Sequence, residues 1–252
     1  MKHEVASFLL AVQFLTRLPI PTGTLFTPER MAASARYYPL VGVLIGGFCA
    51  LVFYGASILF PQLIAVIISV GAGLLLTGAF HEDGLADTFD GIGGGHTAER
   101  ALEIMKDSRL GTYGTLALII VLALKAAALA ALPSALVMTA LVAGHGLSRL
   151  SSVLVISTSR YVRAHGTGKP VADGLSPAGL LIALITGVLI IAGWSGVAPI
   201  IALLYALVGL ALGHVILRLF FERKLGGYTG DTLGAVQQIS EIGFYLGLLA
   251  WL

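Results

Sequence analysis

Long apolar runs dominate this chain, and they restrict it to folds that a lipid bilayer can surround. Hydrophobic residues make up 57% of the 252 residues and charged residues only 11%, which excludes an ordinary soluble globular protein. Several runs approach the ~20 residues needed to cross a bilayer. We count seven, at about 37–60, 63–80, 113–132, 134–156, 177–194, 197–220 and 233–252. The sequence therefore predicts an all-α, polytopic transmembrane helix bundle of about seven spans, built as one integral membrane domain over residues 1–252.

The first 18 residues favour a helix at the membrane surface. They are apolar in the middle and charged at both ends, and Pro19 and Pro21 follow directly. A signal peptide is the alternative, but no small-x-small cleavage site follows. A second helix start is expected at Thr27-Pro28-Glu29, where a capping hydroxyl precedes proline.

Basic residues are concentrated in alternate connections of the predicted bundle. The connections that hold nearly every Lys and Arg are the N-terminal arm, 81–112, 157–176 and 221–232. By the positive-inside rule these connections are cytoplasmic and the C-terminus is outside. The basic loop 157–176, which includes His165 and Asp173, either guides an anionic substrate or serves as an orientation signal. The net charge of +2 carries no information about nucleic acid, and we expect none among the partners.

An unusual concentration of acid follows the second apolar run. Seven of the 13 acidic residues lie within 82–107. If the helix of the preceding run continues, Asp83, Asp87 and Asp90 fall at i, i+4 and i+7 on one face. Three carboxylates on one face repel one another, and a divalent cation would turn that repulsion into coordination. The segment therefore predicts a Mg²⁺ site for phosphoryl transfer in a cytoplasmic loop, 81–112. A solvated acidic loop is the alternative.

Two features follow within the same connection. Glycines at 91–95, including Gly93 and Gly94, allow close backbone approach to a phosphate, although a flexible turn explains them equally well. Thr97 is expected to cap a helix over 98–109.

The end of that predicted helix carries both signs of charge. Asp107 is a candidate to complete the metal shell. Lys106 and Arg109 are candidates to neutralise pyrophosphate oxygens.

Further polar residues lie inside or at the ends of later spans. Arg149 is expected to face the bundle interior and to meet either a carboxylate or the substrate, with a structural ion pair as the alternative. Asp231 has glycines on both sides at the start of the last span, where it suits either a helix N-cap or a ligand contact. Gln238 and Glu241 place polar groups in the same apolar helix.

Five blocks of sequence resemble the adenosylcobinamide-GDP ribazoletransferase (cobalamin synthase) family. They are FLTRLP at 14–19, YPLVG at 38–42, FHEDGLADTFDG at 80–91, IMKDSRLGT at 104–112 and GGYTGDTLGA at 226–235. Together they run from near the N-terminus to the last span, so the resemblance covers the whole chain.

The resemblance implies a Mg²⁺-dependent enzyme in the inner membrane of a prokaryote, with a cytoplasmic active site and the lipid bilayer as its surroundings. Such an enzyme joins α-ribazole, or its 5′-phosphate, to adenosylcobinamide-GDP and releases GMP. We then expect Asp83, Asp87, Asp90 and Asp107 to be catalytic and to hold Mg²⁺. Assembly into a homo-oligomer is left open.

Contacts with substrate would come from a second group of residues. They are Lys106, Arg109, Arg149, Asp231, Gly93 and Gly94.

Two rival functions remain at this stage. The Asp-x-x-Asp-Gly step at 87–91 resembles the CDP-alcohol phosphotransferases, but the Ala-Arg that follows it in that superfamily is replaced here by glycines. That departure prevents the transfer of their nucleotide contacts to this chain. A transporter lined by intramembrane polar residues is the second rival; the acids, however, cluster in one loop rather than at mid-membrane.

Overall fold

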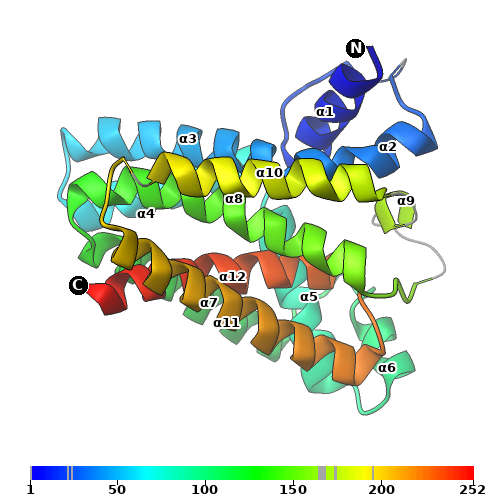
Figure 1. Cartoon of the computed structure of the whole chain (residues 1–252). Coiled ribbons are helices and arrows are strands. Elements are labelled where there is room, and N and C mark those ends of the chain that lie inside the picture. The colour runs from blue at the N-terminus through cyan, green and yellow to red at the C-terminus, as the bar shows by residue number, and fades with distance from the viewer. Residues whose placement is uncertain (1, 22, 24, 164–168, 173–174, 195) are drawn as a thin grey trace.

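The computed structural model describes residues 2–21, 23, 25–163, 169–172, 175–194 and 196–252, and these segments are predominantly helical (Figure 1). The described part contains no strand; one isolated β-bridge joins Tyr161 and Tyr228. The all-α prediction is confirmed. Within the basic loop 157–176, His165 and Asp173 lie outside the described residues.

The helices follow the predicted runs closely. Their bounds are α1 Lys2–Leu15, α2 Pro28–Ser34, the short 3-10 helix η1 Ala35–Tyr37, α3 Tyr38–Ser57, α4 Gln62–Thr77, α5 Phe80–Gly94, α6 Ala98–Ile104, α7 Thr112–Ala131, α8 Ser134–Thr158, α9 Lys169–Ala172, α10 Pro177–Trp194, α11 Ile200–Leu225 and α12 Gly230–Trp251.

Five helical segments are long and apolar enough to cross a membrane, and a bent pair of helices raises the number to six. The five are Pro28–Ser57, Thr112–Ala131, Ser134–Thr158, Pro177–Trp194 and Ile200–Leu225. Their outer faces expose many large apolar side chains, such as Leu51 and Ile216. Apolar surface of this extent suits contact with lipid rather than with water. The chain is therefore a membrane protein, in rough agreement with the seven predicted spans.

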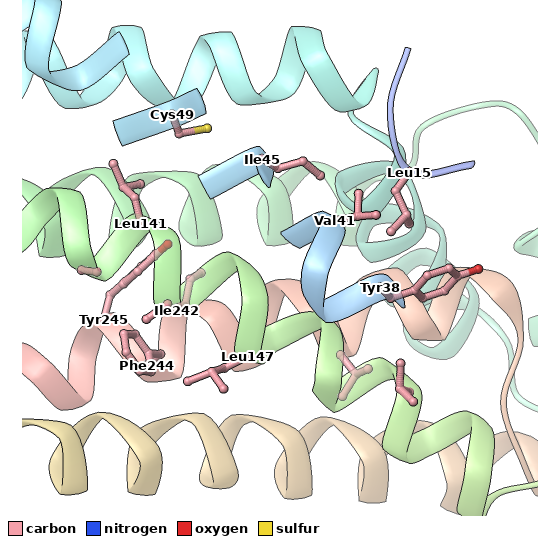
Figure 2. Packing of buried hydrophobic residues seen from close by; sticks show 14 of the residues in the cluster. Leu15, Tyr38, Val41, Ile45, Cys49, Leu141, Leu147, Ile242, Phe244 and Tyr245 are labelled. Atoms are coloured by element: carbon pink, nitrogen blue, oxygen red, sulfur yellow. The ribbon is translucent and has the colours of Figure 1, made fainter. Parts of the chain in front are cut away.

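The seventh predicted span is also a helix, α12, but polar residues interrupt its apolar sequence. Gln237, Gln238 and Glu241 are all buried. Helix α12 packs against α5, α7, α8 and α11, so it occupies the interior of the bundle. Figure 2 shows Phe244 and Tyr245 of α12 close to Leu147 and Leu141 of α8. The interior position explains how this helix tolerates polar groups at membrane depth.

Glycines bring two pairs of long helices into close contact. A Cβ on Gly46 of α3 would overlap the carbonyl oxygen of Leu141 in α8. A Cβ on Gly209 of α11 would likewise overlap the carbonyl oxygen of Gly243 in α12, and the reverse contact is equally tight. Because lipid chains are as apolar as leucine, helices in a membrane gain most from close packing of small residues.

We expect Gly243→Ala to destabilise the protein by about 1–3 kcal/mol, because the new methyl group has no room against α11. Thermal unfolding of detergent-solubilised protein measures this loss. Gly71→Ala in α4 is the matched control, since a Cβ there meets nothing within 4 Å. Equal unfolding temperatures for the two variants would contradict the proposed packing of α11 on α12.

The acidic segment does not continue the preceding helix, and this corrects one expectation. Helices α4 and α5 meet at an angle of 88°. Gly78 and Ala79 between them both have left-handed backbones, with φ of 67° and 54°. Residues 80–94 form a separate helix, rather than an irregular loop, and this helix packs against α7 and α12. Asp83, Asp87 and Asp90 nevertheless share one helix, as their spacing predicts.

The short helices gather at one end of the bundle. In Figure 1, α1, α2, α6 and α9 lie toward the right-hand end of the long helices, and the C-terminus lies toward the opposite end. The predicted caps form there: Thr27 accepts a hydrogen bond from the backbone N–H of Arg30, and Thr97 from that of Arg100. Helix α6 ends at Ile104, earlier than the predicted residue 109. This end of the molecule carries the motifs singled out in the sequence.

Candidate active site

Helices α5 and α12 cross at two glycines. A Cβ on Gly84 would lie 2.7 Å from the carbonyl oxygen of Asp231, and a Cβ on Gly234 would lie 3.0 Å from that of His81. Neither position leaves room for a larger side chain without movement of the backbones. The crossing therefore places the first turn of α12 directly beside the acidic helix.

Asp87 lies among other carboxylates near this crossing. The electrostatic contacts of Asp87 are with Asp231, Asp83, Arg163 and Asp90. Asp87 is half-buried and Asp83 is exposed. Within the described residues, neither side chain accepts a hydrogen bond, so their oxygens are free to meet a ligand. The crossing thus gathers like charges that are only partly neutralised by protein.

Asp231 faces the one arginine in this environment. Its Oδ2 lies 2.6 Å from Nη2 of Arg163, and both side chains are largely buried. The predicted N-cap role is wrong, because Thr229 caps α12 and forms a capping box with Thr232. Asp231 instead lies in the first turn, which leaves its carboxylate directed at Arg163. The sequence indicated Arg163 only as part of the basic loop 157–176; its pairing with Asp231 was missed, because only the fold brings that loop to the start of α12.

Asp90 holds α5 against α7. One of its oxygens accepts the backbone N–H of Gly111 at 2.7 Å, and the other accepts that of Gly114 at 2.8 Å. These donors belong to the first turn of α7, where a negative charge is stabilising. Both oxygens of this predicted metal ligand are therefore engaged by protein.

We expect Asp90→Ala to destabilise the fold by about 0.5–2 kcal/mol, because it removes the cap of α7. Thermal unfolding of the purified protein checks this, with Asp107→Asn as an exposed acidic control that leaves the unfolding temperature unchanged. If Asp90→Ala unfolds like the parent protein, the capping role of Asp90 is wrong.

Two charged residues after α6, Asp107 and Arg109, are paired with each other. Asp107 Oδ2 lies 2.6 Å from Nη2 of Arg109. Hydrogen bonds from Arg109 lower the pKa of Asp107 to about 2. Lys106 is exposed. The contacts of Asp107 are thus with its neighbour Arg109, and the structure does not bring it into one shell with the α5 carboxylates.

The glycine-rich stretch is helical as far as Gly94, so the predicted loop or turn over 91–95 is wrong. A Cβ on Gly93 would lie 2.7 Å from the ring of Tyr113, and one on Gly94 would lie 3.3 Å from Ile104. Gly93 and Gly94 are exposed in spite of these contacts. Close packing of α5 on α6 and α7 accounts for both glycines.

Arg149 faces the bundle interior, as predicted. It is buried, and its Nη1 donates to the carbonyl oxygen of His145 at 2.9 Å, while Nε has no partner. Arg149 and His81 line two small cavities, of about 30 and 20 Å³, behind the α5–α12 crossing. Each cavity has room for about one water molecule.

A buried polar network lies farther along α12. Glu241 is 3.2 Å from Nζ of Lys125 and accepts hydrogen bonds from Gln237 at 2.6 Å and Tyr245 at 2.9 Å. Gln238 extends the network, because it accepts from Lys125 and donates to Glu82 on α5. The ion pair of Lys125 with Glu241 was not predicted from the sequence. The presence of opposite charges in two predicted spans could have indicated it.

Carboxylate chemistry at the crossing suits a hard cation such as Mg²⁺. Among the described residues, no three His, Cys, Asp or Glu side chains lie close enough to hold a metal ion by themselves. Mg²⁺ commonly uses one or two carboxylates together with water and substrate phosphates. Asp83 and Asp87 offer free oxygens of this kind. The fold and the site therefore define an integral membrane protein with a carboxylate-rich site at the charged end of its helices.

Comparison with known proteins identifies the family. A profile of the family described as cobalamin-5-phosphate synthase matches residues 7–249. A Shewanella frigidimarina protein named adenosylcobinamide-GDP ribazoletransferase is 46% identical over 98% of this chain and 95% of its own length. A Leptothrix cholodnii protein of the same name is 47% identical, with coverage of 98% and 96%. No solved structure matches the chain. The chain belongs to the cobalamin-5-phosphate synthase family, and it is a transferase of cobalamin biosynthesis.

Proposed function

We propose that this enzyme joins α-ribazole, or its 5′-phosphate, to adenosylcobinamide-GDP and releases GMP. The names of the family and of its relatives support this reaction. The structural observation that carries the proposal is the close crossing of α5 and α12, which brings Asp83, Asp87 and Asp231 into electrostatic range of one another. A reaction on a diphosphate requires oxygen donors and positive charge at one place, and this crossing supplies both.

The proposed step is a phosphoryl transfer. The ribose 3′-oxygen of α-ribazole attacks the phosphorus that is attached to cobinamide. A new P–O bond forms, the bond from that phosphorus to the bridging oxygen breaks, and GMP departs with the bridging oxygen. The proton of the attacking hydroxyl passes to a carboxylate. Asp83 is the proposed acceptor, because it is exposed and no described donor occupies its oxygens.

We assign Mg²⁺ to Asp83 and Asp87, with Asp231 nearby, because the oxygens of Asp90 and Asp107 are engaged elsewhere. When bound, Mg²⁺ would neutralise the diphosphate and make its phosphorus more electrophilic.

Positive side chains complete the proposed site. Arg163 lies beside Asp231 and would contact the diphosphate once substrate competes for it. Lys106 and Arg109 are exposed at the same end of the bundle, where they would attract the anionic substrate.

We place the site at the cytoplasmic face of the inner membrane. The connections at the end that carries it hold most of the basic residues, and the positive-inside rule assigns such connections to the cytoplasm.

Release of GMP from adenosylcobinamide-GDP on addition of α-ribazole tests the proposed reaction. Purified protein in phospholipid vesicles should release GMP only with both substrates and a divalent cation, and chelation by EDTA should stop it. CDP-diacylglycerol with an alcohol acceptor tests the CDP-alcohol phosphotransferase alternative. Turnover with that pair and none with adenosylcobinamide-GDP would overturn the proposal.

A further inference from the structure

A wide cleft opens where the N-terminal arm meets the bend between α4 and α5. Its volume is about 730 Å³. The arm lies against the start of α5, since the rings of Phe14 and Phe80 are 5.2 Å apart. The lining of the cleft includes Arg17, Gly78, Ala79 and Asp83. The cleft therefore includes a residue of the FLTRLP block, to which the proposed reaction has so far given no role.

Arg17 is fixed at the helix break by its backbone. Its N–H donates to the carbonyl oxygen of Leu76 at 2.7 Å, at the end of α4. Its side chain lies across Gly78, so closely that a Cβ on Gly78 would overlap Nε and would lie 3.0 Å from Cδ. The absence of a Cβ at Gly78 thus leaves space for the side chain of Arg17, in addition to permitting the left-handed backbone.

Arg17 is exposed, and its guanidinium has no described acceptor. In the described part of the chain, no side-chain or backbone oxygen forms a hydrogen bond or an ion pair with it. Arg17 is the one basic residue among those that line the cleft, and Asp83 lines the same cleft without being paired to it. A cation and a free carboxylate therefore share one cavity with space between them.

The backbone at the bend is strained beside this cation. Ala79 has a φ of 54°, and it is the only non-glycine residue in the described chain with a positive φ. Such a conformation costs of order 1–3 kcal/mol and is concentrated at functional sites. The bend keeps Arg17 and Asp83 on the walls of one cleft. The strained backbone of Ala79 is therefore part of what positions these two side chains.

We propose that Arg17 is the residue that binds the 5′-phosphate of the attacking nucleotide when α-ribazole 5′-phosphate is the acceptor. The inference rests on the proposed function. The reacting 3′-hydroxyl and the 5′-phosphate belong to one ribose, so their protein contacts must lie in one cavity. Asp83 and Arg17 meet that condition, and arginine binds phosphate through two parallel hydrogen bonds.

Steady-state GMP release with the two acceptors tests the role of Arg17. The Michaelis constant for α-ribazole 5′-phosphate should rise about 10–100-fold in Arg17→Ala, which is the loss expected for a charge-assisted hydrogen bond. The constant for α-ribazole should stay within about twofold of the parent value, since that acceptor has no phosphate to bind. Arg17→Lys should restore part of the affinity. Arg100→Gln, at an exposed surface pair, is the control and should change neither constant.

A second measurement tests binding directly and does not depend on catalysis. Binding of α-ribazole 5′-phosphate to parent and Arg17→Ala protein is measured by calorimetry in detergent and in phosphatidylcholine nanodiscs. Weaker binding by the variant in both media supports the inference.

Three results would overturn the role of Arg17. They are an equal loss with both acceptors, unchanged constants with both acceptors, and an effect seen only in nanodiscs, which would assign Arg17 to a lipid headgroup. A parent enzyme that releases no GMP with either acceptor would instead remove the proposed function, so the two failures are distinguishable.

Discussion

Asp87→Asn and Asp83→Asn should each lower the rate of GMP release by at least about 10²–10³-fold, the usual cost of removing one preorganised electrostatic contact. Both side chains belong to the α5–α12 crossing, and neither accepts a described hydrogen bond. The loss should therefore appear in turnover without a matching loss of stability. Initial rates and thermal unfolding, measured on the same preparations, separate the two effects.

Glu99→Gln on α6 is the matched control for these variants. Glu99 is an exposed acid of the same segment, and it lies in the first turn of a surface helix. Its removal should leave the rate of GMP release unchanged. Rates near that of the parent enzyme in both Asp83→Asn and Asp87→Asn would contradict the assignment of the site to α5.

Lys125→Met should destabilise the protein by about 3–5 kcal/mol, because it leaves the carboxylate of Glu241 buried without its cation. The two side chains are 3.2 Å apart and almost fully buried between α7 and α12. Unfolding of the detergent-solubilised protein can be followed by fluorescence, since Trp194 is buried against Phe244 of α12.

The combined variant Lys125→Met with Glu241→Gln distinguishes a buried charge from a packing defect. Removal of both charges should recover part of the lost stability, because neither member of the Lys125–Glu241 pair is then left buried without the other. Arg100→Met is the surface control, where an exposed pair contributes only about 0–1 kcal/mol. A Lys125→Met variant as stable as the parent protein would show that the ion pair does not form.

Local pattern predicted most of the long helices, and it predicted a helical spacing for the aspartates of α5, although as a continuation of the preceding run. The spacing of Asp83, Asp87 and Asp90 requires only the helical period, so that part of the prediction was secure. The bend between α4 and α5 was harder to predict from the sequence. Gly78 permits a left-handed backbone, but Ala79 resists one, and only tertiary packing holds it there.

The partners of each carboxylate could not be predicted, because they come from distant parts of the chain. Asp90 shares a helical stripe with Asp83, but it lies about two turns farther along α5, at the start of α7, where backbone N–H groups engage it. Asp231 joins Asp87 only because Gly84 and Gly234 let two helices cross closely. A glycine in a sequence can indicate that another backbone approaches closely, but it does not identify the segment that does so.

Binding of Mn²⁺, followed by electron paramagnetic resonance in the presence of adenosylcobinamide-GDP, tests most directly whether the α5 carboxylates form the metal-dependent site. The parent protein should bind Mn²⁺, and Asp87→Asn should weaken that binding by about 10–100-fold. Asp107→Asn, at the exposed pair with Arg109, should bind as the parent does. Equal Mn²⁺ affinity in Asp87→Asn and the parent protein, or a loss confined to Asp107→Asn, would contradict the site described for this enzyme.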